Sequence, residues 1–353
     1  MLVGGQGTRL RPLTISAPKP MLPAAGVPFT AHQLARARGA GVDHVVLATS
    51  YRAEVFEQYF GDGSSFGLDL EYVTETEPLG TGGGIRNVAG RLRAAPGEPV
   101  LVFNGDVLSG VDLRAVVERH SDSAADVTLH LVEVEDPRAF GVVPTDAAGR
   151  VTAFLEKTPD PPTNRINAGC YIFRRAVIDA IPSGRPVSVE RETFPGLLAA
   201  DAMVMSYVDS SYWLDLGTPA AFVRGSCDLV LGRVESSAMP GAPGQSLVLA
   251  GTQVAADAVL DAGSAVGRGV SIGPGATVSG SVVFDDAVIE AGAQVRGSVV
   301  GRGARIGAAA VVDGAVIGDG ARIGAHNELL GGVRVFPGHE LAEGAVRFSS
   351  DRS

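Results

Sequence analysis

The stretch Val278–Val300, VSGSVVFDDAVIEAGAQVRGSVV, contains the same short pattern twice, 17 residues apart, and a third copy begins at Val312. Apolar residues recur around it at steps of six, shortened to five once in each period: Val254, Leu260, Val266, Ile272, Val278, Phe284, Ile289, Val295, Val300, Ile306, Val312, Ile317, Ile323, Leu329 and Val335. A disordered segment would not keep these residues in register, whereas short repeats of this kind stack into solenoids. We therefore predict a hexapeptide solenoid, a left-handed parallel β-helix, over residues 247–353.

Residues 1–231 have a different organisation, in which short β-branched runs alternate with amphipathic stretches. Strands are predicted at 42–50, 70–75, 100–106 and 125–134, and helices at 31–41, 83–95 and 113–121. This alternation indicates an α/β domain with a Rossmann-like, mostly parallel sheet covered by helices on both faces. The Gly-, Pro- and Ser-rich stretch 232–246 is interpreted as a linker. Ligands of such sheets bind beyond the carboxyl ends of the strands, which directs attention to the loops there.

Composition narrows the function classes. A net charge of −10 argues against bulk nucleic-acid binding, so an anionic ligand must be met by a local basic cluster. The sequence has no apolar run of 18 residues that could cross a membrane. Its two cysteines, Cys170 and Cys227, are too few for a disulfide framework. They are interpreted as reduced, buried thiols of a cytoplasmic protein.

The glycine-rich segment GGQGTRLRPLTISAPKP, residues 4–20, is the first candidate ligand loop. Successive glycines allow several backbone N–H groups to face one phosphate. No GxxxxGK[ST] pattern is present, and a GxGxxG pattern fails because Leu10 occupies the last glycine position. The chain has 29 Lys and Arg residues together, of which two are lysines, Lys19 and Lys157. A lysine kept at these two positions suggests sites where a compact ammonium is needed and a planar guanidinium would not fit.

The loop is followed by further motifs in a fixed order: EPLGTGGGI (77–85), FNGDVLSGVDL (103–113), FGVV (140–143), FLEKTPDPPTNRINAGCYIF (154–173), SVERETFP (188–195) and YWLDLGTPAAFVRG (212–225). Together they resemble the sugar-phosphate nucleotidyltransferases over essentially all of residues 1–231, and the hexapeptide tail is similar too. The segments INAGCYIF, SVERETFP and YWLDLGTP look most like the branch of that family that makes GDP-mannose. The resemblance implies a nucleotidyltransferase catalytic domain at 1–231, a linker at 232–246 and a β-helix domain at 247–353.

The implied reaction is the Mg²⁺-dependent, in-line attack of mannose 1-phosphate on the α-phosphate of GTP, which yields GDP-mannose and pyrophosphate. The attacking phosphate oxygen is already ionised, so the site must supply alignment and charge neutralisation rather than a general base. By resemblance the catalytic residues are Arg9, Lys19, Asp106 and Asp215. Asp106 and Asp215 match the two carboxylates that hold the metal in this family.

The resemblance also assigns binding residues, with GTP and mannose 1-phosphate as the small-molecule partners. The nucleotide would contact Gly4, Gly5, Gly7, Thr8, Arg9, Lys19, Gly80, Thr81 and Asp106. The sugar phosphate would contact Gly141, Glu156, Lys157 and Asn167, with Lys157 on the phosphate and the carboxylate and amide on sugar hydroxyls. The choice of guanine rests on the resemblance alone.

Several alternatives stay open at this stage. The chain could make an ADP-, UDP- or dTDP-glucose type of product, or it could be a non-catalytic regulatory homologue. An acyltransferase activity of the solenoid would need a catalytic histidine, for which His326 and His339 are the candidates; both are interpreted as surface or capping residues. The solenoid is expected to support homo-oligomerisation. Because three residues, MLV, precede Gly4, we expect either an upstream start or a truncated first strand.

Overall fold

The structure is a computed structural model that describes residues 1–5, 7–50 and 52–347. It divides into two compact units, one formed by Met1–Gly5 with Arg36–Trp213 and the other by Gln6–Ala35 with Leu214–Ser353. Each unit is built from segments that lie far apart in the sequence. Within the described residues, no helix is long and apolar enough to cross a bilayer.

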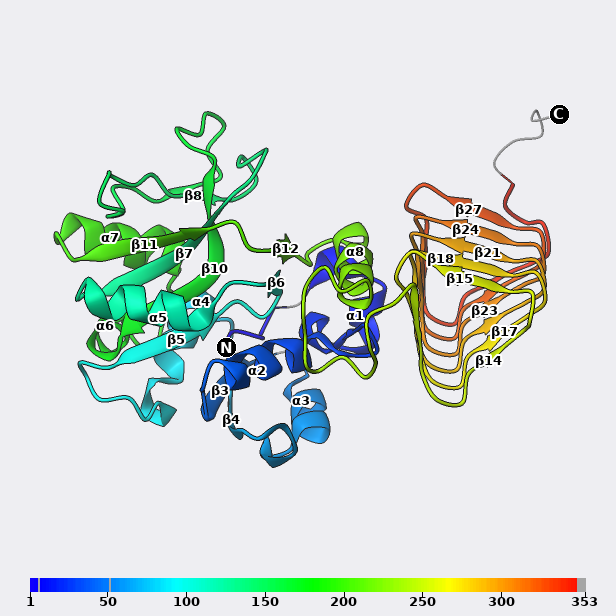
Figure 1. Cartoon of the computed structure of the whole chain (residues 1–353), viewed down its shortest axis with the longest axis horizontal. Helices are drawn as coiled ribbons and strands as arrows, with labels where there is room; N and C mark the ends of the chain where they lie inside the picture. The colour runs from blue at the N-terminus through cyan, green and yellow to red at the C-terminus, as the bar shows by residue number, and fades with distance from the viewer. Residues whose placement is uncertain (6, 51, 348–353) are drawn as a thin grey trace. The chain divides into compact units, whose positions relative to one another are not determined.

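The first unit is organised around a mixed sheet (Figure 1). Its strands include β5 (Pro99–Phe103), β7 (Val127–Glu133), β10 (Arg165–Arg174) and β11 (Val204–Asp209). A separate two-stranded sheet is formed by β3 (His44–Thr49) and β4 (Asp69–Thr74). β3 pairs with β4 and β7 with β11 in parallel, whereas β10 is antiparallel to both β5 and β7. Because β5 and β7 flank β10, they run in the same direction. The predicted mostly parallel sheet is confirmed, with β10 as its one antiparallel central strand among those named.

Helices cover both faces of this sheet, as the sequence predicts. Along β10, Tyr171 and Phe173 share one buried cluster with residues of α4 (Gly80–Asn87), α6 (Arg175–Ala180) and α7 (Phe194–Ala199). Cys170 and Ile172 point the other way, into a cluster with residues of α2 (Phe29–Gly39) and α5 (Leu113–Asp122). Successive side chains of a strand alternate between its faces. The two clusters are therefore the two cores on either side of one sheet.

The helix predicted at 83–95 is wrong at both ends. α4 begins earlier, at Gly80, and gives way to a short 3₁₀ turn at Ala89–Arg91 followed by extended chain. The Arg175 guanidinium donates to the carbonyl oxygens of Leu92 and Ala94, at 3.1 Å each. A side chain thus satisfies two carbonyl groups of the extended segment and holds it in place.

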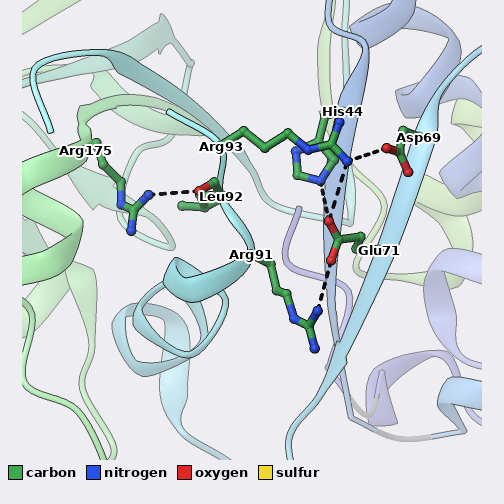
Figure 2. A network of polar contacts seen from close by, with 7 residues as sticks. All are labelled: His44, Asp69, Glu71, Arg91, Leu92, Arg93 and Arg175. Atoms are coloured by element: carbon green, nitrogen blue, oxygen red, sulfur yellow. Dashed lines mark hydrogen bonds and ion pairs between the residues drawn. The ribbon is translucent and has the colours of Figure 1, made fainter. Parts of the chain in front are cut away.

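Charged side chains fasten this extended segment to the edge of β4 (Figure 2). Glu71 accepts from the His44 ring at 3.0 Å, and Arg91 lies 3.5 Å from its other oxygen. Arg93 pairs with Asp69 and also lies 3.7 Å from Glu71. The arginine side chains are more than half exposed, so the network contributes little free energy to folding. It does fix the path of the chain between α4 and β5.

Residues Met1–Val3 lie between β3 and β5. The Leu2 N–H donates to Phe103 O at 2.8 Å and the Val3 N–H to Ala48 O at 3.0 Å. Leu2 alone makes β-bridges, to Ala48 and Asn104, both parallel. Beside these residues is a cavity of about 540 Å³ with a mainly apolar lining from β3, β5, α2 and α5. Leu2 thus joins β3 to the residue that follows β5 through its two bridges.

The remaining elements of the first unit are short. They are α3 (Ala53–Phe60), β6 (Val107–Ser109), β8 (Gly141–Val142) and β9 (Leu155–Glu156). β8 and β9 pair antiparallel, and β8 joins the sheet through Ile166 of β10. This places Gly141, Glu156 and Asn167 near one edge of β10.

The second unit contains a small helical part and the solenoid. The small part comprises α1 (Leu13–Ser16), the hairpin of β1 (Pro23–Ala24) and β2 (Val27–Pro28), and α8 (Pro219–Val230). The Ser226 hydroxyl of α8 accepts from the Ala25 N–H at 2.9 Å, which joins helix and hairpin. No helix or strand occurs between residues 231 and 245. The predicted division at 231 and 246 stays a prediction.

The C-terminal part is a parallel β-solenoid, which confirms the predicted fold (Figure 1). One face is built from β13 (Ser246–Val248), β16 (Ser264–Val266), β19 (Val282–Val283), β22 (Val299–Val300), β25 (Val316–Ile317) and β28 (Arg334–Val335). The second comprises β14 (Gln253–Val254), β17 (Ser271–Ile272), β20 (Val288–Ile289), β23 (Arg305–Ile306), β26 (Arg322–Ile323) and β29 (Glu340–Leu341). The third comprises β15 (Val259–Asp261), β18 (Thr277–Ser279), β21 (Gln294–Arg296), β24 (Val311–Asp313) and β27 (Glu328–Leu330).

The solenoid core follows the predicted periodicity with one correction. Val283, rather than Phe284, occupies the inward position, because it pairs with Val300 of the next coil and belongs to the central apolar cluster. One corner of successive coils is closed by a ladder of buried serines. The Ser281 N–H donates to Ser264 Oγ, the Ser298 N–H to Ser281 Oγ and the Ala315 N–H to Ser298 Oγ, at 3.0–3.2 Å.

Candidate active site

In the second unit, the glycine loop is packed directly against Lys19. Gly7 adopts φ +58°, and a Cβ at this position would lie 2.9 Å from Lys19 Cβ and 3.0 Å from Thr14 Cγ2. The Thr14 hydroxyl donates to Gly7 O at 2.9 Å. Thr8 and Arg9 follow in a 3₁₀ turn, Thr8–Leu10. A residue with a side chain would fit neither the backbone conformation nor the space at Gly7.

Arg9 and Lys19 converge on one carboxylate. Lys19 Nζ lies 3.6 Å from Asp215 Oδ1, and Arg9 Nη2 lies 4.0 Å from Asp215 Oδ2. The Lys19 side chain is 10% exposed and that of Arg9 is 67% exposed. Gly217 allows the approach, because a Cβ there would lie 2.5 Å from Arg9 Nη2. Gly217 was not among the predicted site residues, although it lies in the YWLDLGTP motif.

In the first unit, Asp106 lies beyond the carboxyl end of β5, where the sheet type predicts ligand-binding residues. The preceding Gly105 N–H donates to Leu2 O at 2.8 Å, and a Cβ at Gly105 would meet that same oxygen. Gly4 is close to Ser50, whose hydroxyl donates to Gly4 O. A Cβ at Gly5 would meet nothing within 4 Å. The loops that follow the first bridge and β5 therefore lie at one edge of the sheet.

Gly80 and Thr81 begin α4, and both contact residues 187–190 of the protein. Gly80 has φ +70°, and a Cβ there would lie 2.7 Å from Val187 O. The N–H groups of Gly82 and Gly83 both donate to Val187 O, at 2.8 and 3.2 Å. Thr81 Oγ1 donates to Glu190 Oε2 at 2.8 Å and accepts from the Val189 N–H at 3.0 Å. Glycine is required at the start of α4 because residues 187–190 pack too closely there for a side chain. Direct contact between this turn and the base stays a prediction.

The predicted sugar-phosphate residues are brought together in the first unit. Gly141 and Glu156 are partners in the β8–β9 pair, and a Cβ at Gly141 would lie 2.8 Å from the Phe154 ring. Lys157 has a left-handed backbone with φ +53°, and its Nζ lies 3.7 Å from Glu156 Oε1. Its side chain is 63% exposed, so the ammonium can meet a ligand phosphate.

The Asn167 side chain makes two hydrogen bonds within its own strand. Its Nδ2 donates to the Tyr171 hydroxyl at 2.8 Å, and its Oδ1 accepts from the Gly169 N–H at 3.0 Å. The register of β10 with β7 shifts between Asn167 and Tyr171, and Gly169 has φ +74°. The two hydrogen bonds of Asn167 therefore span the register shift in β10. Its contact with the sugar stays a prediction.

The structure offers no evidence for cysteine chemistry. Burial raises the pKa of the Cys170 and Cys227 thiols to about 12, so neither is a thiolate at neutral pH. Among residues 1–5, 7–50 and 52–347, no three His, Cys, Asp or Glu side chains gather as a metal cluster. A site for Mg²⁺ built from two aspartates and substrate phosphates is smaller than such a cluster.

The solenoid histidines lie on its surface. His326 is half exposed, with Nε2 3.9 Å from the exposed carboxylate of Glu343. His339 Nδ1 lies 3.3 Å from Pro337 O in its own turn. The histidine–carboxylate pair was not foreseen, but its length and exposure do not make it a strong hydrogen bond.

Comparisons with known proteins agree with this architecture. Residues 1–230 match the family described as Nucleotidyl transferase, and residues 242–347 match the GMPPB C-terminal domain. The chain is 62% identical over 352 residues to the mannose-1-phosphate guanylyltransferase of Mycobacterium tuberculosis, covering 99% of this chain and 97% of that protein. It is 34% identical over 290 residues to mannose-1-phosphate guanylyltransferase 1 of Arabidopsis thaliana, covering 82% and 78%.

A solved structure shows the same fold in the N-terminal part. It is HddC from Yersinia pseudotuberculosis complexed with GMP-PN, with a TM-score of 0.55 and 29% identity. The match covers 64% of this chain and 96% of that one. The family match spans more than half of the chain, and the sequence motifs fall within it. The chain therefore belongs to the nucleotidyl transferase family and is a nucleotidyltransferase with an appended GMPPB-type β-solenoid.

Proposed function

We propose that this enzyme joins GTP to mannose 1-phosphate, giving GDP-mannose and pyrophosphate. The observation that carries nucleotidyl transfer is the convergence of Arg9 and Lys19 on Asp215 beside the glycine loop. The identity of the substrates is supported by the names of its relatives, above all the Mycobacterium tuberculosis enzyme. The guanine nucleotide analogue in HddC supports the choice of base.

Arg9 and Lys19 would bind the triphosphate of GTP. Both cations neutralise charge on the departing pyrophosphate, and Gly4, Gly5, Gly7 and Thr8 would contribute backbone N–H groups to it. A phosphate oxygen of mannose 1-phosphate forms a bond to the α-phosphorus, while the bond from that phosphorus to the β-phosphate bridging oxygen breaks. The attacking oxygen carries its charge already, so no side chain must remove a proton.

Asp106 and Asp215 would hold Mg²⁺ by their side chains. Their carboxylate oxygens are hard donors, which Mg²⁺ prefers together with phosphate oxygens and water. When bound, the ion would offset the negative charge of the phosphates. Within the protein, Asp215 also orients Lys19 and Arg9 before substrate binds, because both cations lie within 4.0 Å of it.

The sugar phosphate would bind in the first unit at Gly141, Glu156, Lys157 and Asn167. Lys157 would hold the phosphate and Glu156 would accept from sugar hydroxyls. Gly80 and Thr81 would form the wall of the base site, with Asp106 near the α-phosphate. These roles agree with the exposure of the Lys157 ammonium and with the pairing of Gly141 with Glu156.

Pyrophosphate release is the test. The purified full-length chain would be assayed with mannose 1-phosphate or glucose 1-phosphate against GTP, ATP, UTP and dTTP, each with and without Mg²⁺. Release with GTP and mannose 1-phosphate alone is expected. Preference for another pair would keep the family and reject the substrates, and saturable binding without release would identify a regulatory homologue.

A homo-oligomeric assembly through the solenoid and a cytoplasmic location are further parts of the proposal. The first coil exposes Val248, Val254 and Val259, each 39–48% exposed, and open coil edges favour association. Light scattering after size exclusion would test this, with a monomer at micromolar concentration as the contrary result.

A further inference from the structure

Glu190 lies at the centre of a compact hydrogen-bond network in the first unit. Its Oε2 accepts from Thr81 Oγ1 at 2.8 Å and from Ser188 Oγ at 2.7 Å. Thr81 Oγ1 in turn accepts from the Val189 N–H at 3.0 Å. Two hydroxyls therefore meet on one carboxylate oxygen, and a threonine hydroxyl is used both as donor and as acceptor. Hydrogen bonds to a charged acceptor are the stronger kind.

The same segment holds the turn that begins α4. Val187 O accepts from two consecutive N–H groups, those of Gly82 and Gly83, and the Val187 N–H donates to Leu79 O at 2.8 Å. Gly80 turns with φ +70° directly against Val187 O. On the far side of the turn, Glu75 Oε2 accepts from the Leu79 N–H at 3.2 Å. The start of α4 is thus bound on both sides, and its conformation depends on residues 187–190.

The sugar-side residue Asn167 makes its own contacts on β10. Its Nδ2 donates to the hydroxyl of Tyr171, which is fully buried. Burial, and next the negative charge of Glu190, raise the pKa of Tyr171, so this hydroxyl stays protonated. The hydrogen bonds given above for Glu190 go to Thr81 and Ser188, so the geometry ties it to the start of α4.

We propose that Glu190 is a positioning residue for nucleotide binding: through Thr81 and Ser188 it holds the Gly80–Thr81 turn in the conformation that receives the base. This inference rests on the proposed function, since that turn was assigned to the nucleotide. Glu190 acts through other residues and is not itself required to touch substrate. Its role should thus appear in the nucleotide affinity more than in the affinity for sugar phosphate.

The test compares steady-state constants for four variants. Glu190→Ala and Thr81→Val remove the carboxylate or the bridging hydroxyl, and each should raise KM for GTP about tenfold, as expected for a lost charge-assisted hydrogen bond. KM for mannose 1-phosphate should change less than about twofold. Thr81→Ser keeps the hydroxyl and should restore KM for GTP. Glu192→Gln is the matched control, because Glu192 lies in the same segment and pairs with Arg185 at an exposed site, and a glutamine oxygen can still accept from the Ser188 N–H as Glu192 Oε1 does at 3.2 Å.

Calorimetric titration with GTP alone, read beside the melting temperature, separates positioning from a purely structural role. Two results together support the proposal. Glu190→Ala binds GTP more weakly at an unchanged melting temperature, and Thr81→Ser binds GTP as the wild-type chain does whereas Thr81→Val does not. A lower melting temperature with unchanged KM and Kd for GTP would overturn it, and so would Thr81→Ser behaving like Thr81→Val.

Failure of the proposed function is distinguishable from failure of this inference. If the wild-type chain prefers another nucleotide, the same variants are compared on that nucleotide, and the contrast between nucleotide and sugar phosphate is still expected. A wild-type chain that binds no nucleotide would overturn both.

Discussion

Lys19 Nζ lies 3.6 Å from Asp215 Oδ1, although the two residues are about 200 positions apart in the sequence. The ammonium is nearly buried, and Gly7 packs on its aliphatic stem. A buried charge requires a partner of opposite sign. Asp215 therefore contributes both to the stability of this loop and to the placement of the ammonium that we propose binds phosphate.

Replacing Asp215 by alanine should abolish turnover. Loss of the carboxylate removes the ion pair that Asp215 makes with Lys19 at 3.6 Å, so we also expect the free energy of unfolding to fall by about 2 kcal/mol. Pyrophosphate release and urea unfolding measure the two effects. Asp122→Ala, at an exposed site at the end of α5, serves as the control and should change neither. Unchanged turnover in Asp215→Ala would remove its catalytic assignment.

Replacing Lys157 by arginine should act on one substrate. The Lys157 side chain is exposed and paired with Glu156, so the broader guanidinium can be accommodated without loss of folding. It presents its charge with a different shape to the sugar phosphate. We expect KM for mannose 1-phosphate to rise roughly tenfold while KM for GTP stays within about twofold. An equal rise in both constants would contradict the separate roles given to Lys19 and Lys157.

Stability should decrease below neutral pH because of His32. Burial lowers the pKa of His32 from 6.5 to about 4, and its ring nitrogens lie 2.7 Å from Ser236 Oγ and 2.9 Å from Ala24 O. Between these two pKa values the unfolded chain binds a proton that the folded chain does not. The contribution of His32 to the free energy of unfolding is therefore fully present above pH 6.5. It declines as the pH falls toward 4, by about 3 kcal/mol in total.

Urea unfolding between pH 4 and 8 measures the slope of the free energy of unfolding against pH. In His32→Gln the slope should be shallower, whereas His339→Gln, at an exposed turn, should retain it. Identical slopes in all three chains would show that other groups govern the acid sensitivity.

The serine ladder should stabilise the solenoid. Ser298 Oγ donates to Arg296 O at 2.6 Å and accepts from the Ala315 N–H at 3.0 Å. Ser298→Ala leaves that buried N–H without an acceptor, which should cost about 1–3 kcal/mol in free energy of unfolding. Circular dichroism during thermal unfolding would show a lower midpoint, with Ser183→Ala at an exposed loop position as the control. An unchanged thermal midpoint in Ser298→Ala would mean that the Ser298 hydroxyl does not stabilise the solenoid.

Local patterns predicted most of the elements, and the departures have identifiable physical causes. The strands expected at 42–50, 70–75, 100–106 and 125–134 correspond to β3, β4, β5 and β7. The helix predicted to reach residue 95 ends early: Leu92 has an extended backbone, and Arg175 holds the extended segment by donating to the carbonyl oxygens of Leu92 and Ala94. The direction of β10 was not predicted, since its apolar alternation is the same in either orientation.

Candidate site residues were predicted individually, but several of their partners were not. Thr81 was assigned to the nucleotide, which stays a prediction, and the sequence did not show that its hydroxyl bridges Glu190 and the Val189 N–H. Asn167 was assigned to the sugar, which stays a prediction, and the sequence did not show that its amide donates to the Tyr171 hydroxyl. Glu190 lies in a quoted motif, yet nothing in SVERETFP by itself says which distant hydroxyl its carboxylate meets.

The sequence by itself determined the solenoid, the alternating α/β elements and the two lysine positions, because periodicity and composition are local properties of the chain. Tertiary structure alone decided that residues 6–35 share a compact unit with residues 214–353, and that Arg9 and Lys19 meet Asp215 there. It also decided that residues 187–190 hold the start of α4. Contacts of this kind depend on how distant segments pack, and no local pattern encodes which partner a buried polar group finds.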